Sequence, residues 1–398
     1  MPEIKKITVP QAYLAFLLVL AVSFTLTSLS IKDVEFASGA DEGYYLRYAS
    51  YIGEHGLGGF ADLFKNYIEN QKDWLYPNPL RMGFIALSSV WLKIFGYSFL
   101  NLAYFSLFSF CVFLIISFYF AAKYFDEKIT LLLAILLAFS PLNMAMARRA
   151  LLDSTFNLFS IFSIWLFFGL LKKRTLLKHI LFILIYSFTI LVKETGVLLS
   201  LFFALYLIFY KGKKYFLSVT LFPFLIVGST YIILAGGLSN VTDMIKIILT
   251  SPGHNEYAIL FGSGPWFRYL IDYILLSPWV VILSSGFVFW YLASKEHDER
   301  VTYFLLAFVV LFFSLNFFTK NVRYLMILDM PMRLFSVLML KKLFEARFPK
   351  QAFILLSVSV VVIAAFDYLN FYNLFARGEI YDPVSYWLLR GQHIIPWR

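Results

Sequence analysis

Long runs of apolar residues, separated by short polar segments, dominate the pattern along the chain. A helix needs roughly 20 mainly apolar residues to cross the hydrocarbon core of a bilayer. We therefore predict eleven membrane-spanning helices, over residues 11–31, 98–122, 129–147, 154–171, 178–192, 196–210, 215–235, 270–293, 302–318, 324–343 and 352–370. A twelfth apolar run, 80–96, has a basic residue near each end, and its place depends on the charge pattern.

Composition supports a membrane protein and excludes a soluble one. The chain has 398 residues, of which 61% are hydrophobic and 15% charged. Soluble chains carry about 45–50% apolar and about 25% charged residues. We predict an all-α polytopic membrane protein whose residues 1–398 form a single transmembrane domain, with no separate soluble domain. The one cysteine, Cys111, excludes an intramolecular disulfide framework.

The basic residues indicate how the helices are oriented. The net charge of +10 is spread over clusters between apolar runs, which is typical of cytoplasmic loops and does not point to nucleic acid. The clusters are Lys5/Lys6, Lys172/Lys173/Arg174/Lys178, Lys211/Lys213/Lys214 and Lys341/Lys342/Arg347/Lys350. All four clusters lie on the cytoplasmic side of the membrane only if 80–96 does not cross the bilayer. We therefore predict an interfacial or re-entrant helix there and a cytoplasmic N-terminus. The loops 32–97 and 236–269 then form the active-site side, outside the cell membrane.

Charged residues that oppose this topology are the candidates for chemistry. The tightest acidic cluster, Asp41-Glu42, follows the first span and is either a solvated helix cap or a functional pair. Cations at the outer ends of spans either reach lipid headgroups or bind an anion. They are Arg81, Arg148, Arg149, Lys193, Arg268, Lys320 and Arg323.

Other signals are weaker. Asp329 and Arg333 are i, i+4 in the tenth span, where they form either a structural salt bridge or a functional intramembrane pair. No histidine or cysteine spacing indicates a metal site, so no metal ligand and no cofactor is assigned. Carboxylates at the outer surface can bind a metal ion, so a divalent metal remains an open alternative.

Five motifs in order resemble the GT-C superfamily of polyprenyl-phosphate-sugar-dependent glycosyltransferases, in the branch of protein O-mannosyltransferases and lipid A aminoarabinose transferases. The motifs are Asp41-Glu42 with Tyr45; Pro79-Leu80 and Gly83, before Phe95-Gly96; Ala147 to Asp153; Val192 to Gly196; and Arg323-Tyr324 before Pro331. The chain departs from the family at Pro77-Asn78-Pro79-Leu80, where His-Pro-Pro-Leu is common, and lacks the soluble domain of some members.

The resemblance implies transfer of a sugar from a polyprenyl-phosphate donor to an acceptor hydroxyl at the extracytoplasmic face, by inverting single displacement. It implies that Asp41 is the base and that Glu42 orients the acceptor or the fold. The phosphate-binding candidates are Arg81, Arg148, Arg149, Lys193 and Arg323, and the sugar-contacting or orienting candidates are Asp153, Tyr45 and Glu194. The carrier, dolichol or undecaprenol, and the acceptor, a protein, lipid or glycan, stay open.

A transporter or lipid flippase is the alternative from another class, and an inactive scaffold is a third. Transporters place ionisable groups near the bilayer midplane at a repeat interface. Here the charges gather at the outer span ends, apart from Asp329 and Arg333, which favours the enzyme.

Overall fold

A computed structural model describes residues 9–32, 41–211, 215–251, 259, 262, 264–295 and 297–379 of the chain. These residues form helices and short connections, without a strand among them. The α-helices are α1 (Val9–Leu29), α2 (Asp41–His55), α3 (Phe60–Glu69), α4 (Met82–Phe95), α5 (Phe99–Tyr124), α6 (Glu127–Ala138), α7 (Pro141–Ala147), α8 (Asp153–Lys172), α9 (Leu176–Val192), α10 (Leu198–Tyr206), α11 (Phe216–Leu234), α12 (Leu238–Thr250), α14 (Arg268–Leu276), α15 (Pro278–Ala293), α16 (Glu299–Leu315), α17 (Met326–Arg347) and α18 (Ala352–Asn370). Shorter helical turns include η3 (Glu194–Val197), η7 (Val322–Leu325) and η8 (Phe371–Arg377).

Each predicted span coincides with a helix or a broken helix, and the all-α fold class is confirmed. Among the described residues, four helices are long and apolar enough to cross a membrane alone, or up to six if each of two bent pairs is one span. The four are Gln11–Leu29, Phe99–Tyr124, Asp153–Lys172 and Ala352–Arg377. The chain is an integral membrane protein, while the number of eleven crossings and their direction stay predictions.

Two breaks bend the predicted spans. The span 129–147 divides into α6 and α7, which meet at 56°. Ser140 accepts a hydrogen bond from the N–H of Asn143 and Pro141 follows it, a sequence that starts a new helix. Helices α11 and α12 meet at 106°. Gly236 and Gly237, with φ of 77° and 140°, make this turn in a region that side chains disfavour.

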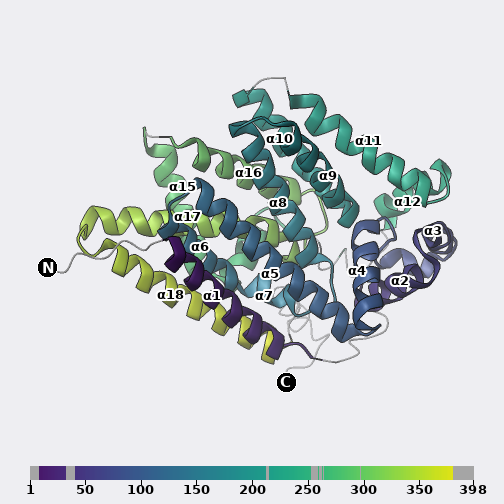
Figure 1. Ribbon diagram of the computed structural model, residues 1–398, viewed down its shortest axis with the longest axis horizontal. Helices are drawn as coiled ribbons and strands as arrows, with labels where there is room; N and C mark the ends of the chain where they lie inside the picture. The colour runs from purple at the N-terminus through teal and green to yellow at the C-terminus, as the bar shows by residue number, and fades with distance from the viewer. Residues whose placement is uncertain are drawn as a thin grey trace.

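The first loop forms a helical layer at one end of the bundle, at the right of Figure 1, where α2, α3 and α4 lie together beside the ends of α9 and α12. Helix α4 packs between α2 and α9. Gly83 permits this close approach, because a Cβ there would lie 2.9 Å from the backbone nitrogen of Val192. The contact places Arg81, the residue before α4, next to the segment that follows α9.

Within the bundle, three charged side chains form a group that we call the buried triad: Asp329, Arg333 and Asp367. Arg333 Nε donates to Asp329 Oδ1 at 2.8 Å, and its Nη1 donates to Asp367 Oδ2 at 2.7 Å. All three are at most 1% exposed. Tyr273 also donates to Asp329, and Arg333 Nη2 donates to Ser277 at the break between α14 and α15. The contacts of Asp329 and Arg333 are therefore those of a structural salt bridge, extended by Asp367, which sequence reasoning did not single out.

Candidate active site

Asp41 lies at the start of α2, where its carboxylate meets an arginine from the far end of the chain. Arg323 Nη1 donates to Asp41 Oδ2 at 2.9 Å. Arg323 sits in the η7 turn, and the Asn321 side chain caps this turn by accepting the N–H of Arg323 at 3.2 Å. The Asp41 side chain keeps 30% of its surface exposed. It is thus both held in place and accessible.

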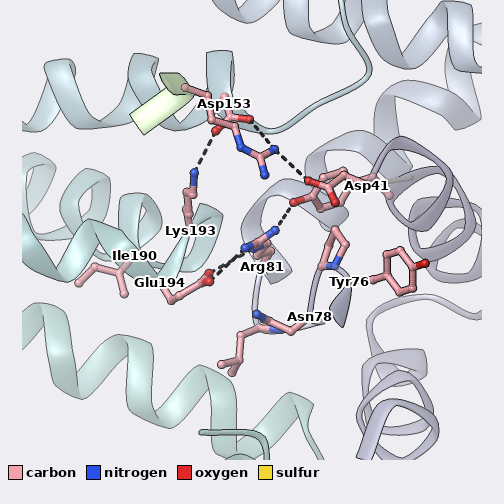
Figure 2. A network of polar contacts seen from close by, with 12 residues as sticks. Asp41, Tyr76, Asn78, Arg81, Asp153, Ile190, Lys193 and Glu194 are labelled. Atoms are coloured by element: carbon pink, nitrogen blue, oxygen red, sulfur yellow. Dashed lines mark hydrogen bonds and ion pairs between the residues drawn. The ribbon is translucent and has the colours of Figure 1, made fainter. Parts of the chain in front are cut away.

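A second carboxylate extends this pair into a row of alternating charges. Arg323 Nη1 lies 3.5 Å from Asp153 Oδ2, and Lys193 Nζ donates to Asp153 Oδ1 at 2.9 Å. Asp153 is the first residue of α8, where the helix dipole favours a carboxylate. The side chains of Asp153 and Lys193 are 2% and 4% exposed. Figure 2 shows Lys193, Asp153 and Asp41 along this row.

Arg81 and Glu194 form a two-pronged pair beside the row (Figure 2). Their two contacts measure 3.1 and 3.3 Å, and Arg81 Nη1 also donates to the hydroxyl of Tyr45, one turn after Asp41. Burial opposes ionisation of Glu194, but the neighbouring Arg81 guanidinium outweighs it and lowers the pKa of that carboxyl to about 2. Glu194 is therefore a carboxylate at neutral pH. It is suited to holding Arg81 in place, but it is itself only a weak base.

The two neighbouring acids Asp41 and Glu42 have different surroundings. Arg149 Nε donates to Glu42 Oε1 at 2.8 Å, and the Glu42 side chain is only 6% exposed. This contact joins α2 to the link between α7 and α8. Glu42 is thus placed to fix the position of α2, while its neighbour Asp41 faces accessible space.

Arg148 lies apart from these contacts. Its Nε donates to the carbonyl of Ser30 at 2.9 Å, and its Nη1 donates to the carbonyl of Phe375. The side chain therefore joins the end of α1 to η8. The structure brings together the other residues to which the resemblance gave a site role, which we call the loop network: Asp41, Glu42, Tyr45, Arg81, Arg149, Asp153, Lys193, Glu194 and Arg323. Two further candidate cations lie outside it: Arg268 pairs with Asp272, and Lys320 donates to the carbonyl of Gly264.

The charges of the loop network balance. Each of its four cations contacts a carboxylate of the network, in the pairs Arg81–Glu194, Arg149–Glu42, Lys193–Asp153 and Arg323–Asp41. Since each of the four cations is paired with a carboxylate of the protein, simple snorkelling does not account for these contacts. Within the described part of the chain, His, Cys, Asp and Glu side chains form no group of three that could hold a metal ion.

Sequence reasoning gave no role to Tyr324, although it follows Arg323 in the quoted motif. The Lys193 ammonium lies 4.3 Å from the centre of the Tyr324 ring and 5.3 Å from that of Phe156. An aromatic face attracts a cation, so these rings help to hold Lys193. Only the signal of an aromatic residue beside a predicted cation could have indicated this contact.

Comparisons with known proteins agree with this architecture. Residues 81–236 match the family model described as dolichyl-phosphate-mannose-protein mannosyltransferase. A comparison with curated protein sequences gives no match.

Solved structures share the fold. ArnT from Cupriavidus metallidurans in the apo state is 14% identical with a TM-score of 0.58, over 92% of this chain and 77% of that one. ArnT from the same organism bound to undecaprenyl phosphate gives the same identity and TM-score, over 88% and 63%. The Archaeoglobus fulgidus oligosaccharyltransferase complex with Zn and sulfate is 15% identical with a TM-score of 0.56, over 90% and 52%. Residues 81–236 of this chain are thus similar to that mannosyltransferase family, and the chain shares its fold with these three structures.

Proposed function

We propose that this chain transfers a sugar from a polyprenyl-phosphate donor to an acceptor hydroxyl at the extracytoplasmic face of the membrane, with Asp41 as the base. The observation that carries the proposal is the row of charges that begins at Asp41. An accessible carboxylate lies 2.9 Å from Arg323, which in turn lies 3.5 Å from a buried Asp153 paired with Lys193. A base beside fixed cations is the arrangement that a phosphate leaving group requires.

The donor class is supported by what the similar proteins bind. The matched family model is described as using dolichyl-phosphate mannose, and one similar structure holds undecaprenyl phosphate. Both molecules are long isoprenoid chains attached to a phosphate, which in dolichyl-phosphate mannose also carries the sugar. In this chain the charged network lies at one end of the apolar bundle, where a lipid phosphate at the membrane surface can reach it.

The proposed reaction needs one base and no general acid. Asp41 accepts the proton of the acceptor hydroxyl while that oxygen forms a bond to the anomeric carbon of the sugar. The bond from the anomeric carbon to the phosphate oxygen breaks, and its electron pair stays on the phosphate. Attack opposite the leaving group inverts the anomeric centre. Lys193, Arg81 and Arg323 stabilise the charge that develops on the phosphate.

The balanced charges of the loop network suggest how donor binding prepares the base. A bound donor phosphate adds a negative charge to the network. Arg323 already contacts both Asp41 and Asp153, so it can turn to the phosphate and remain paired with Asp153. Asp41 then loses its contact with Arg323, and its carboxylate is left to accept a hydrogen bond from the acceptor hydroxyl. We propose that donor binding exchanges the Asp41 contact of Arg323 for a phosphate contact.

A donor screen tests the proposed function. Membranes that contain the protein are incubated with polyprenyl-phosphate sugars labelled in the sugar, and label is followed into protein, lipid and glycan fractions. Transfer to one of these fractions is expected. Movement of intact labelled lipid across vesicles without transfer would instead favour the transporter alternative.

Substitution of the base gives the matching prediction. Asp41→Asn keeps the size of the side chain but cannot accept the proton, and general-base catalysis typically contributes about 10²–10⁴-fold to the rate. We expect a loss of that size, with normal accumulation in the membrane. Asp62→Asn is the control, because Asp62 is in the same loop and accepts a hydrogen bond only from Tyr51 among the described contacts. An Asp41→Asn enzyme with more than about a tenth of the wild-type rate would exclude Asp41 as the base.

A further inference from the structure

We infer that Asn143, a buried residue of α7, is a positioning residue that fixes the relative placement of three site-bearing segments. These segments carry Arg149, Asp153 and Arg323. The inference concerns a side chain outside the loop network, and its consequence for catalysis rests on the function proposed above.

Asn143 uses both ends of its amide to join three helices. Its Nδ2 donates to Asp329 Oδ2 of α17 at 2.9 Å. Its Oδ1 accepts a hydrogen bond from Asn157 Nδ2 of α8 at 3.4 Å. Asn143 is completely buried, and the other two residues are at most 2% exposed. Helices α7, α8 and α17 are therefore connected through one side chain.

Each partner lies close along the chain to a charged residue of the loop network. Asn157 is four residues after Asp153, which is about one turn of α8. Asp329 is six residues after Arg323, and η7 continues directly into α17. Asn143 itself is six residues before Arg149. The contacts of Asn143 thus lie within four to six residues, along the chain, of Arg149, Asp153 and Arg323 of the loop network.

The short helix α7 needs such a connection. It has seven residues and meets α6 at 56°, so α6 does not set its direction by simple continuation. Asp329 provides a fixed acceptor, because Arg333 and Tyr273 hold it from the other side. An apolar side chain at position 143 would leave buried polar atoms of Asp329 and Asn157 without these contacts, which is unfavourable in a bilayer.

The role is one of position, because Asn143 has no charge and none of its hydrogen bonds within the described part of the chain goes to the loop network. A misplacement of reacting groups by about 1 Å can lower a rate about 10²-fold. Substitution of Asn143 is therefore expected to lower activity much more than a substitution elsewhere in the bundle that destabilises the protein equally.

The test compares Asn143→Ala with a control of matched chemistry. Tyr303→Phe is suitable, because the Tyr303 hydroxyl is buried and donates to the carbonyl of Ile164 at 2.6 Å between α16 and α8. Ile164 is eleven residues from Asp153, about 16 Å along the helix. Both variants lose one buried polar group between helices, so both should lower the melting temperature in detergent.

Three readouts separate a positioning role from a merely structural one. Asn143→Ala should lower kcat/KM about tenfold to a hundredfold and weaken the binding of undecaprenyl phosphate, measured by native mass spectrometry. Tyr303→Phe should change kcat/KM and the affinity for undecaprenyl phosphate by less than about threefold. A residue without a positioning role is expected to be only weakly coupled to the site. Equal kcat/KM and lipid affinity in the two variants, at matched melting temperature, would overturn the inference.

An exchange of the two partners provides a rescue. Asn143→Asp alone places two carboxylates against each other and should be as damaging as Asn143→Ala. The double variant Asn143→Asp/Asp329→Asn restores one donor and one acceptor at this contact but removes a carboxylate partner of Arg333, so it should recover part of the kcat/KM lost in Asn143→Asp. Recovery of the melting temperature without recovery of kcat/KM would contradict the inference. Should Asn143→Ala fail to accumulate, Asn143→Ser replaces it in the comparison with Tyr303→Phe.

The binding readout separates this inference from the proposed function. A wild-type protein that binds undecaprenyl phosphate but transfers no sugar from any donor would contradict the proposed function alone. Normal transfer and normal lipid affinity in Asn143→Ala would contradict the positioning role alone.

Discussion

The loop network and the buried triad are both built from arginines and carboxylates, but they differ in exposure and in balance. In the loop network, four cations face four carboxylates, and Asp41 keeps 30% of its side-chain surface exposed. In the buried triad, one arginine serves two carboxylates, and none of the three side chains is more than 1% exposed. The first group includes a pair with a partly exposed carboxylate, Asp41–Arg323, whereas the second is buried throughout.

The comparison shows that ion pairing alone does not identify a site in a membrane protein. Removing one partner of a buried pair leaves an uncompensated charge, so such a pair resists change. An exposed pair is weaker, and a competing anion can replace one of its members. Arg323 is shared by a partly exposed carboxylate, Asp41, and a buried one, Asp153. The partner exchange proposed above concerns only its contact with Asp41.

The largest expected effect breaks the buried triad. Arg333→Met leaves Asp329 and Asp367 facing each other without a cation, and loss of one partner of a buried pair costs about 3–5 kcal/mol. We expect little folded protein in membranes, and a strongly lowered melting temperature for any that is purified.

A graded control accompanies this prediction. Asp367→Asn should cost less than Asp329→Asn, because Asp329 accepts hydrogen bonds from Asn143, Tyr273 and Arg333. An Arg333→Met protein with wild-type stability, followed by thermal unfolding in detergent, would show that the triad does not hold the bundle together.

A smaller effect is expected from Lys193→Gln, which changes the loop network and leaves the buried triad intact. A charge-assisted contact to an anion contributes roughly 1.5–3 kcal/mol. If Lys193 binds the donor phosphate, the KM for the donor should rise by about tenfold or more. Asp153 keeps its contact with Arg323 at 3.5 Å, so the fold should survive.

Arg148→Gln is the informative comparison for this variant. The sequence predicts a phosphate role for Arg148 also, but its guanidinium donates to two backbone carbonyls. We expect lower stability and an almost unchanged donor KM, measured in the same membranes. A larger rise in KM for Arg148→Gln than for Lys193→Gln would place the donor phosphate elsewhere.

Sequence reasoning reached much of this arrangement, and its gaps have a physical cause. Apolar runs gave the positions of the helices, and the motifs pointed to the members of the loop network. The pairings did not follow, because Arg323 and Asp41 are 282 positions apart and meet only through packing. Asn143 and Asp367 were missed because each is one of only a few polar residues within a long apolar run. The predicted span 129–147 runs through the break before α7, although Ser140-Pro141 is a pattern typical of a helix start.

The smallest expected effect concerns Glu194 and the pH. Arg81 lowers the pKa of Glu194 from its ordinary 4.5 to about 2, although burial acts in the opposite direction. A carboxyl with a depressed pKa stabilises the folded state fully above its ordinary pKa, and this contribution is lost as the pH falls towards the lowered value. Between pH 5 and 8 the contribution is therefore constant.

Glu194→Gln keeps an acceptor for Arg81 and removes the charge, so we expect a stability loss of about 1 kcal/mol. Between pH 5 and 8, the difference in melting temperature from the wild type should not change, and it should narrow below about pH 4.5. A difference in melting temperature that changes between pH 5 and 8 would mean that Glu194 titrates in that range, and the supporting role given to this carboxylate would then be wrong.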